Sequence, residues 1–248
     1  MAGTSNVLGA ALIGVLLLQV DHRVVLPAGR FAPLVGLEQA QADLPVASFS
    51  LDVRPVTRAQ FARFLAEHPQ WSRERVNARL ADERYLASFD RLRPGDPVVE
   101  VSYFAARAYC QWVHARLPTT LEWEYAAAAD ETLRDASRSP AQLQRILDWY
   151  SKTSSPDDLH QAGSPRNVYG IEALHGLVWE WTEDFNGQSS FGDSRSAERN
   201  ANFTCGGALE SNRREEYAAF MRYALRSSLT PRASLPNVGF RCASGEPP

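Results

Sequence analysis

Proline and glycine divide this chain into short periodic segments. The 248 residues include 15 prolines and 15 glycines, and most of them fall between stretches with regularly spaced apolar residues. Because both residue types end regular elements, this distribution predicts a loop-rich fold rather than long repetitive elements. A chain of this length buries roughly 70% or more of its unfolded surface, so one core suffices. With neither an internal repeat nor a linker in the sequence, we expect a single domain over residues 21–248.

Charge and composition indicate which classes of binding partner are compatible with this chain. Hydrophobic residues make up 44% of the chain and charged residues 22%, which is ordinary for a globular protein. The formal net charge is −3, and Lys and Arg are scattered along the sequence. A nucleic-acid-binding surface needs a basic stripe. We therefore expect no nucleic-acid partner.

The N-terminal segment differs from the rest of the chain. Residues Val7 to Val20 form a charge-free apolar run, shorter than the about 20 residues of a membrane helix and similar to the apolar region of a signal peptide. No Lys or Arg precedes the run and no small-x-small cleavage site follows it, so a buried strand is the alternative. We expect residues 1–20 to be a signal peptide or an N-terminal anchor, with no other membrane contact, in a periplasmic or secreted protein.

The three cysteines also bear on whether the protein is exported. Cys110 lies within a helical pattern and is interpreted as a small buried apolar residue. Cys205 and Cys242 flank the C-terminal segment, and in an oxidising compartment they would form a disulfide. Two unpaired thiols are the alternative. Five histidines are also present, but they show neither the HxH nor the HxxxH spacing of metal ligands.

Helix starts are the clearest local signals. Thr57 is suited to cap a helix that must end near Pro69. Ser102 precedes a strongly amphipathic segment and is a second N-cap. Thr119 and Glu122 form a capping box, which predicts a third helix after Pro118.

Other segments are less strongly patterned. Residues 24–49 alternate short extended pieces with turns, which predicts strands. Residues 130–165 are polar with one amphipathic piece at 143–150, and they are interpreted as a surface insertion. After residue 167 only 215–224 has a helical pattern.

Five segments, in order and with compatible spacing, resemble the formylglycine-generating enzyme (sulfatase-modifying factor) family. They are Pro55 to Phe64, Pro97 to Trp112, Arg116 to Ala127, Asn167 to Trp181, and Gly206 to Arg241 with Arg226-Ser227 and Asn237-Val238-Gly239-Phe240-Arg241 inside it. The resemblance implies a mixed α/β (α+β) fold related to the C-type-lectin-like fold, with little regular secondary structure. Four aromatic residues in these motifs are expected in the core: Trp123, Trp179, Trp181 and Phe240.

The family's redox chemistry needs residues that this sequence lacks. In active members two cysteines bind a copper ion that activates oxygen, and soft thiolates suit Cu(I). Anchoring on Arg226-Ser227 puts Ala218 at the second position, and the first falls on Ser211 or Arg213. Ala208 replaces a family serine. We therefore expect no copper and no formylglycine generation by the family mechanism.

A structural calcium ion is the family metal that this chain could retain. In relatives the segment that aligns with Gly176 to Trp181 holds Ca²⁺ through backbone carbonyls and a glutamate. Gly176, Val178 and Glu180 would supply oxygen ligands here. Leu177 replaces the usual asparagine. The alternative is that Glu180 accepts hydrogen bonds in the core.

Two functions remain open. The first is an exported accessory or maturation factor that binds a partner protein or peptide, with a groove that includes Tyr217, Arg222 and Tyr223. The segment from Tyr217 to Tyr223 is similar to the cysteine-lacking branch found near denitrification genes. The second is an oxidoreductase-like enzyme that modifies a peptide or siderophore-type substrate without a cysteine. Arg213, Arg214 and Arg222 could bind the partner in this groove. An equal alternative is that these arginines pair with Glu215 and Glu216 on a solvated surface.

Overall fold

The computed structural model describes residues 23–33, 43–152, 159, 165–185 and 214–245. It mixes helices with short strands, as the sequence predicts, and the α/β class is confirmed. The strands are β1 (Arg23–Leu26), β2 (Gly29–Phe31), β3 (Leu44–Val46), β4 (Phe49–Asp52), β5 (Trp179–Glu180), β6 (Val238–Gly239) and β7 (Ala243–Ser244). The helices are α1 (Arg58–Glu67), α2 (Tyr103–Trp112), α3 (Thr120–Ala127), α4 (Pro140–Tyr150) and α6 (Arg214–Ser228), with 3₁₀ turns at Pro69–Trp71 and Phe89–Arg91.

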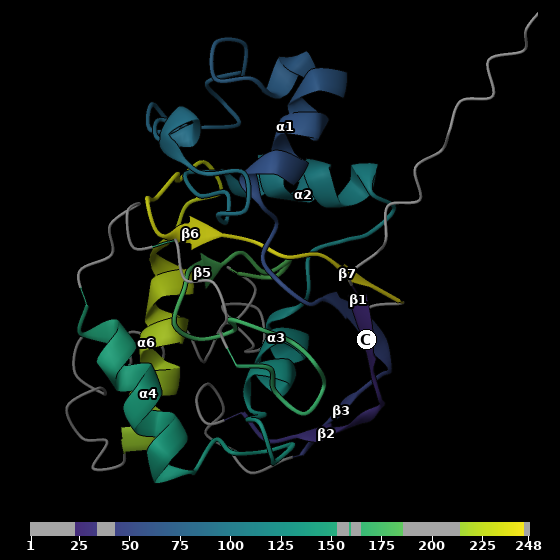
Figure 1. The fold of residues 1–248 in the computed structure, drawn as a ribbon, viewed down its shortest axis with the longest axis vertical. Coiled ribbons are helices and arrows are strands. Elements are labelled where there is room, and N and C mark those ends of the chain that lie inside the picture. The colour runs from purple at the N-terminus through teal and green to yellow at the C-terminus, as the bar shows by residue number, and fades with distance from the viewer. Residues whose placement is uncertain (1–22, 34–42, 153–158, 160–164, 186–213, 246–248) are drawn as a thin grey trace, which may run out of the picture.

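The strands form three small sheets. Strand β4 lies between β1 and β7 in an antiparallel sheet of order β1-β4-β7. Strands β2 and β3 form an antiparallel pair, whereas β5 and β6 pair in parallel. Figure 1 places α1 and α2 at one end of the molecule, beyond β6 and β5, and shows α4 beside α6 along one side.

The predicted helix starts are confirmed. Thr57 accepts a hydrogen bond from the backbone N–H of Gln60, whose side chain bonds back to the Thr57 N–H, so α1 also begins with a capping box. Ser102 caps α2 by accepting from Ala105. At α3 the Thr119–Glu122 capping box is formed as predicted. Each cap satisfies backbone donors that the first turn of a helix leaves unpaired.

Aromatic side chains fill the larger core. Phe61, Phe64, Tyr109 and Phe240 contact one another with ring centroids 5.3–6.1 Å apart. Trp181, Trp123 and Phe240 are buried, as predicted. Trp179 is only partly buried, because it lies at the surface against α4 and not within the core.

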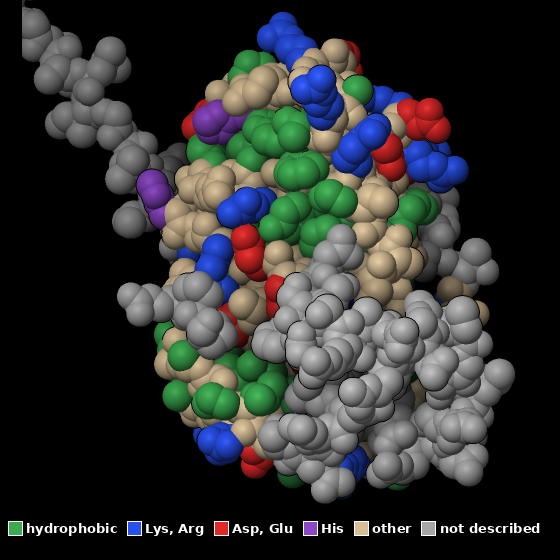
Figure 2. All heavy atoms as spheres, turned by 180° about the vertical axis from the view of Figure 1, so that it is seen from behind, with side chains coloured by type: hydrophobic (Ala, Val, Ile, Leu, Met, Phe, Trp, Pro, Cys, Tyr) green, Lys and Arg blue, Asp and Glu red, His purple; other side chains and the backbone are tan. Residues whose placement is uncertain are grey.

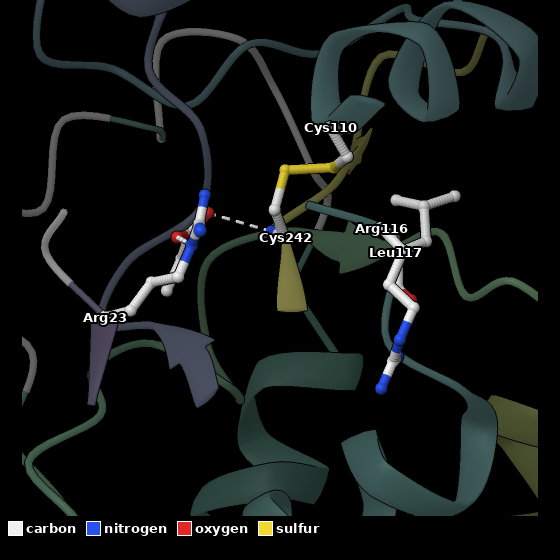
Figure 3. The surroundings of a disulfide bond; sticks show 6 residues. Arg23, Cys110, Arg116, Leu117 and Cys242 are labelled. Carbon is white, nitrogen blue, oxygen red and sulfur yellow. Dashed lines mark hydrogen bonds and ion pairs between the residues drawn. A yellow bond between two sulfur atoms is a disulfide. The ribbon is translucent and has the colours of Figure 1, made fainter. Parts of the chain in front are cut away.

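The disulfide prediction was wrong in one partner. Cys242 is bonded to Cys110, with the Cα atoms 5.5 Å apart, and both residues are fully buried. Figure 3 shows the bond linking the end of α2 to the chain just before β7. The pairing of Cys205 with Cys242 is therefore excluded, and Cys205 itself lies outside the described residues. Tertiary packing brings residues 132 apart into contact here, which sequence proximity does not reveal.

A partly buried carboxylate lies beside this bond. The Cys242 N–H donates to Asp52 Oδ2 at 2.8 Å, and Arg23 Nε donates to Asp52 Oδ1 at 2.8 Å. Burial raises the pKa of Asp52, and the Cys242 N–H and the Arg23 charge oppose that rise. These contacts tie β1, β4 and the C-terminal segment together around the disulfide.

The surface mixes charges. On the face seen in Figure 2, basic and acidic side chains lie among apolar ones. Within the part of the chain that the structure describes, no helix is long and apolar enough to cross a membrane.

Candidate functional site around helix α6

Ala218 lies on the buried side of α6. Its side chain packs against Leu143 and Ile146 of α4 and is 3% exposed. Its backbone carbonyl accepts hydrogen bonds from Tyr150 Oη at 3.1 Å and from Arg222 Nη1 at 3.3 Å. The residue predicted to stand at a family cysteine position is therefore an alanine covered by another helix. The other aligned positions, Ala208, Ser211 and Arg213, lie outside the described residues.

Helix α4 provides that cover. It is longer than the predicted amphipathic piece, because Ser139 caps it and Pro140 occupies its first turn. Its apolar side faces α6 and buries Leu143 and Ile146. The predicted surface insertion thus contains a packed helix that covers one side of α6, as Figure 1 shows.

Arg222 is held by a carboxylate that is distant in sequence. Its Nε and Nη2 donate to Glu124 of α3 at 2.9 and 2.6 Å, and Arg226 Nη1 donates to the same carboxylate at 2.8 Å. Arg222 Nη1 also donates to Tyr150 Oη at 3.2 Å. Both arginines are 7% exposed and lie over the Trp123 ring. We call Glu124, Tyr150, Arg222 and Arg226 the Glu124 cluster.

The charges of this cluster are fixed. Burial would raise the pKa of Glu124, but the Arg222 and Arg226 guanidinium groups outweigh it and lower the pKa to about 2. Burial alone would lower the pKa of Arg222, yet the charge of Glu124 raises it above its usual range. The carboxylate and the guanidinium therefore stay ionised at neutral pH. A permanently charged, fully paired group is suited to hold α3, α4 and α6 together and is poorly suited to proton transfer.

His175 borders the Glu124 cluster. Its Nε2 lies 3.0 Å from the carbonyl oxygen of Ala127, so Nε2 carries the proton and donates. Burial, followed by the positive charge of Arg222, lowers the pKa of His175 to about 3. Its Nδ1 is buried and has no partner among the residues that the structure covers. The ring is therefore a neutral imidazole at physiological pH.

This pKa predicts a pH dependence of stability. Unfolded histidine has a pKa of 6.5, against about 3 in the fold. Between these two pH values His175 is protonated in the unfolded chain and neutral in the folded chain. The free energy of unfolding therefore falls as the pH decreases from 6.5 to 3. The slope for one group approaches about 1.4 kcal/mol per pH unit. Urea unfolding of the native protein and of His175→Gln between pH 7 and 4.5 should show a shallower slope in the variant, and parallel curves would contradict the assignment.

Two neighbouring cavities border α4 and share Gln142, Ile146 and His175 in their walls. A cavity of about 30 Å³ lies between α3, α4 and α6 and is lined by Glu124, His175, Ala218 and Arg222 among others. It has room for about one water molecule. A cleft of about 760 Å³ lies along α4, with Arg145, Asp148 and Trp149 on one side and Leu174 and His175 on another. Of these two cavities, the larger has the size of a ligand site.

The predicted groove residues do not line one surface. Tyr217 is 43% exposed, whereas Arg222 is buried against α3. Successive residues in an α-helix are about 100° apart around its axis, so Tyr217, Arg222 and Tyr223 project on different sides of α6. The side chains of Glu215 and Glu216 lie outside the described residues. The structure thus brings Arg222 to Glu124, and it does not bring the three groove residues together.

Glu180 does not fit a calcium site. Both of its carboxylate oxygens accept from Arg241, at 2.8 Å each, and Oε2 also accepts from Trp123 Nε1 at 2.7 Å. The Arg241–Glu180 pair is fully buried. A guanidinium therefore occupies the place that a divalent cation would need, and the alternative of a core hydrogen-bond acceptor fits the geometry. Gly176 and Val178 offer carbonyls without this carboxylate.

No other metal centre is evident in the described ranges, where no three His, Cys, Asp or Glu side chains converge. We expect chelation with EGTA to leave the melting temperature of the purified protein unchanged, because no described carboxylate cluster would lose a cation. Differential scanning calorimetry with and without added Ca²⁺ checks this. A calcium-dependent rise in melting temperature would show that the folded protein binds the ion, and it would contradict this expectation.

With this geometry established, comparison with known proteins places the chain. A family profile described as "Sulfatase-modifying factor enzyme 1-like domain" matches residues 15–245. The chain belongs to the formylglycine-generating enzyme (sulfatase-modifying factor) family.

Its relatives differ in activity. It is 30% identical over 280 residues to "Inactive C-alpha-formylglycine-generating enzyme 2" of Bos taurus. That alignment covers 92% of this chain and 89% of the bovine protein. It is 33% identical over 170 residues to the formylglycine-generating enzyme of Streptomyces coelicolor, covering 61% of this chain and 54% of the relative. It is also 31% identical over 215 residues to "Serine/threonine-protein kinase pkn1" of Chlamydia caviae, covering 80% of this chain.

The chain spans about a third of that chlamydial relative, 33% of its length. Among solved structures it is similar to PvdO from Pseudomonas aeruginosa, with 21% identity, a TM-score of 0.48, and coverage of 89% of this chain and 93% of the other.

Glu124 is the site residue that the sequence did not reveal. It follows the capping Glu122 and the core Trp123, and that motif is fully accounted for by capping and packing. Its partners, Arg222 and Arg226, lie 98 and 102 residues away. Their i, i+4 spacing on a helix places both arginines on one side and was the available signal for a shared counterion.

Proposed function

We propose that this protein is an exported member of the family that binds a partner polypeptide and does not generate formylglycine. The observation that carries the proposal is Ala218. At the position of a family cysteine it offers a methyl group, and Leu143 and Ile146 cover it. In the family mechanism two thiolates hold the copper ion that activates oxygen, and the positions predicted to correspond to them supply alanine, serine or arginine. The residues present do not fit a copper ion.

The surrounding contacts support a binding role. In the described structure, the Glu124 cluster makes the side of α6 near Ala218 rigid and fully paired. The cavity there, of about 30 Å³, is too small for a peptide. The neighbouring cleft of about 760 Å³ has room for several side chains of a partner. An accessory protein needs such a surface and does not need a redox pair.

Export is supported by the Cys110–Cys242 bond, because structural disulfides persist in oxidising compartments such as the periplasm. Acid trapping of thiols in the native host, followed by alkylation and mass spectrometry, should find Cys110 and Cys242 unmodified in the periplasmic or secreted fraction. Recovery of both residues as alkylated thiols in the cytoplasm would overturn this part of the proposal.

The activity itself is tested with copper. The purified protein is loaded with Cu(I) and assayed for oxygen consumption and peptide mass change with a cysteine-containing peptide. The formylglycine-generating enzyme of a relative serves as the positive control. We expect neither stoichiometric copper nor loss of the thiol. Conversion of the cysteine-containing peptide would contradict the proposal. Conversion in the absence of copper would favour the alternative, an enzyme that modifies a peptide or siderophore-type substrate without a cysteine.

A further inference from the structure

Three aromatic rings gather at the surface where α4 ends. Trp149 and Tyr150 are the last residues of α4, and Trp179 is the first of β5. The Trp179 ring lies 4.9 Å from each of the other two and is stacked on Tyr150. All three are partly exposed. Tyr150 is fixed by the Ala218 carbonyl, and the Trp179 backbone N–H donates to Asn237, so the rings are held in place before any ligand arrives.

The same surface carries unused hydrogen-bond donors. The indole N–H groups of Trp149 and Trp179 make no hydrogen bond to any described residue, whereas those of Trp123 and Trp181 are both bonded. Lys152, in the turn after α4, is exposed and forms no ion pair within the same ranges. The surface therefore offers aromatic faces, two neutral donors and one cation.

Two hollows meet at these residues. A pocket of about 300 Å³ is lined by Trp149, Tyr150, Lys152, Trp179, Pro236 and Asn237. The cleft of about 760 Å³ also has Trp149 and Lys152 in its wall. These two residues therefore border both hollows, which lie next to each other. Two adjacent hollows favour a chain-like ligand over a single small ring.

We propose that this surface docks a short acidic, aromatic-containing segment of the partner polypeptide. The proposal rests on the proposed function and names its binding site. An aromatic side chain of the segment packs against the exposed Trp149 and Trp179 rings, where aromatic pairs are stabilised beyond their buried area. A neighbouring carboxylate accepts from Lys152 and from an indole N–H. The unpaired ammonium of Lys152 disfavours a basic segment.

The test uses an N-acetylated, amidated peptide with one Phe between two Glu residues. Binding to the full chain is measured by tryptophan fluorescence and calorimetry at low and high salt. Trp149→Ala should weaken binding by about 3–10-fold. Lys152→Ala should weaken it by about 2–5-fold and remove most of the salt dependence.

Matched controls come from the same chain. Arg107→Ala removes an α2 cation that is already paired with Glu183, and Trp112→Phe removes an indole that is already bonded to Glu67. Neither should change the dissociation constant. Peptides in which Ala replaces Phe, or Gln replaces both Glu, should bind more weakly to the native protein. Near-ultraviolet circular dichroism verifies that each variant is folded.

The outcomes separate this inference from the proposed function. Absence of binding, or binding unchanged in both Trp149→Ala and Lys152→Ala, overturns the docking site. N-acetylphenylalanine alone binding as tightly as the peptide overturns the peptide assignment in favour of a small-molecule pocket. A basic peptide or an oligonucleotide binding better overturns the charge argument. The proposed function fails instead on turnover of the cysteine peptide, whichever of these results is obtained.

Discussion

Replacement of Glu180 by glutamine is expected to lower the free energy of unfolding by about 3–5 kcal/mol, because it leaves a buried guanidinium without its counterion. Arg241 is fully buried, and Glu180 accepts from its Nε and Nη2. The remaining donors of Arg241 bond the backbone carbonyls of Asp52, Val53 and Glu172. The ion pair therefore fixes three chain segments from inside, and urea unfolding of the variant measures its loss.

An exposed pair provides the control. Glu131→Gln breaks the Arg145–Glu131 pair, whose side chains are 51% and 39% exposed, and should cost less than about 1 kcal/mol. The double variant Glu180→Leu/Arg241→Met should be less destabilised than Glu180→Gln, because it leaves no unpaired buried charge. If Glu180→Gln and Glu131→Gln were equally stable, the buried pair would not have the role that we assign to it.

Removal of the disulfide is expected to have the second large effect. The bond closes a loop between residues 132 apart, and Cys110→Ala/Cys242→Ala should lose about 3–5 kcal/mol, mainly through the greater freedom of the unfolded chain. Guanidinium unfolding of the oxidised protein, the reduced protein and the double variant measures this difference. The reduced protein and the double variant should unfold at similar denaturant concentrations.

Cys205→Ala is the matched control, since the described bond does not use this residue. It should leave the unfolding midpoint of the oxidised protein unchanged. A midpoint that does not respond to reductant, or that falls in Cys205→Ala as much as in the double variant, would contradict the pairing of Cys110 with Cys242.

Local features of the fold were predictable because their causes are local. The caps at Thr57, Ser102 and Thr119 act on backbone donors within three residues, so the sequence alone places the starts of α1, α2 and α3. The family resemblance then supplied the fold class. Even so, Gln60 as the partner of Thr57 was not anticipated, although it occupies the third helical position that a capping box requires.

The pairings of the candidate site were not predictable in the same way. Glu215 and Glu216 are the sequence neighbours of Arg222, yet its counterion is Glu124 of another helix. Cys205 lies much closer in sequence to Cys242 than Cys110 does, yet Cys110 forms the bond. In both cases tertiary packing decides which groups meet, and spacing along the chain contains little information about it.

The covering of Ala218 also depends on packing. The sequence predicts an alanine in place of a family thiol, and only the structure shows that α4 occupies the adjoining space. Trp179 was expected in the core for its size, but it contributes to a surface cluster with Trp149 and Tyr150. Apart from the disulfide, these departures from the sequence predictions lie around α4, where the polar sequence of residues 130–165 gave the least periodic information.

The Cys110–Cys242 bond also determines how the molecule carries mechanical load. When the two ends of the oxidised chain are pulled apart, tension passes from Cys110 directly to Cys242, and α3, α4, β5 and α6 lie in the bypassed loop. Because the two cysteines are 132 residues apart in the sequence, reduction should release about 45 nm of additional contour length at roughly 3.5 Å per residue. Single-molecule extension before and after reductant would read this difference directly. Until the bond is cut, the polypeptide that contains the Glu124 cluster is shielded from force.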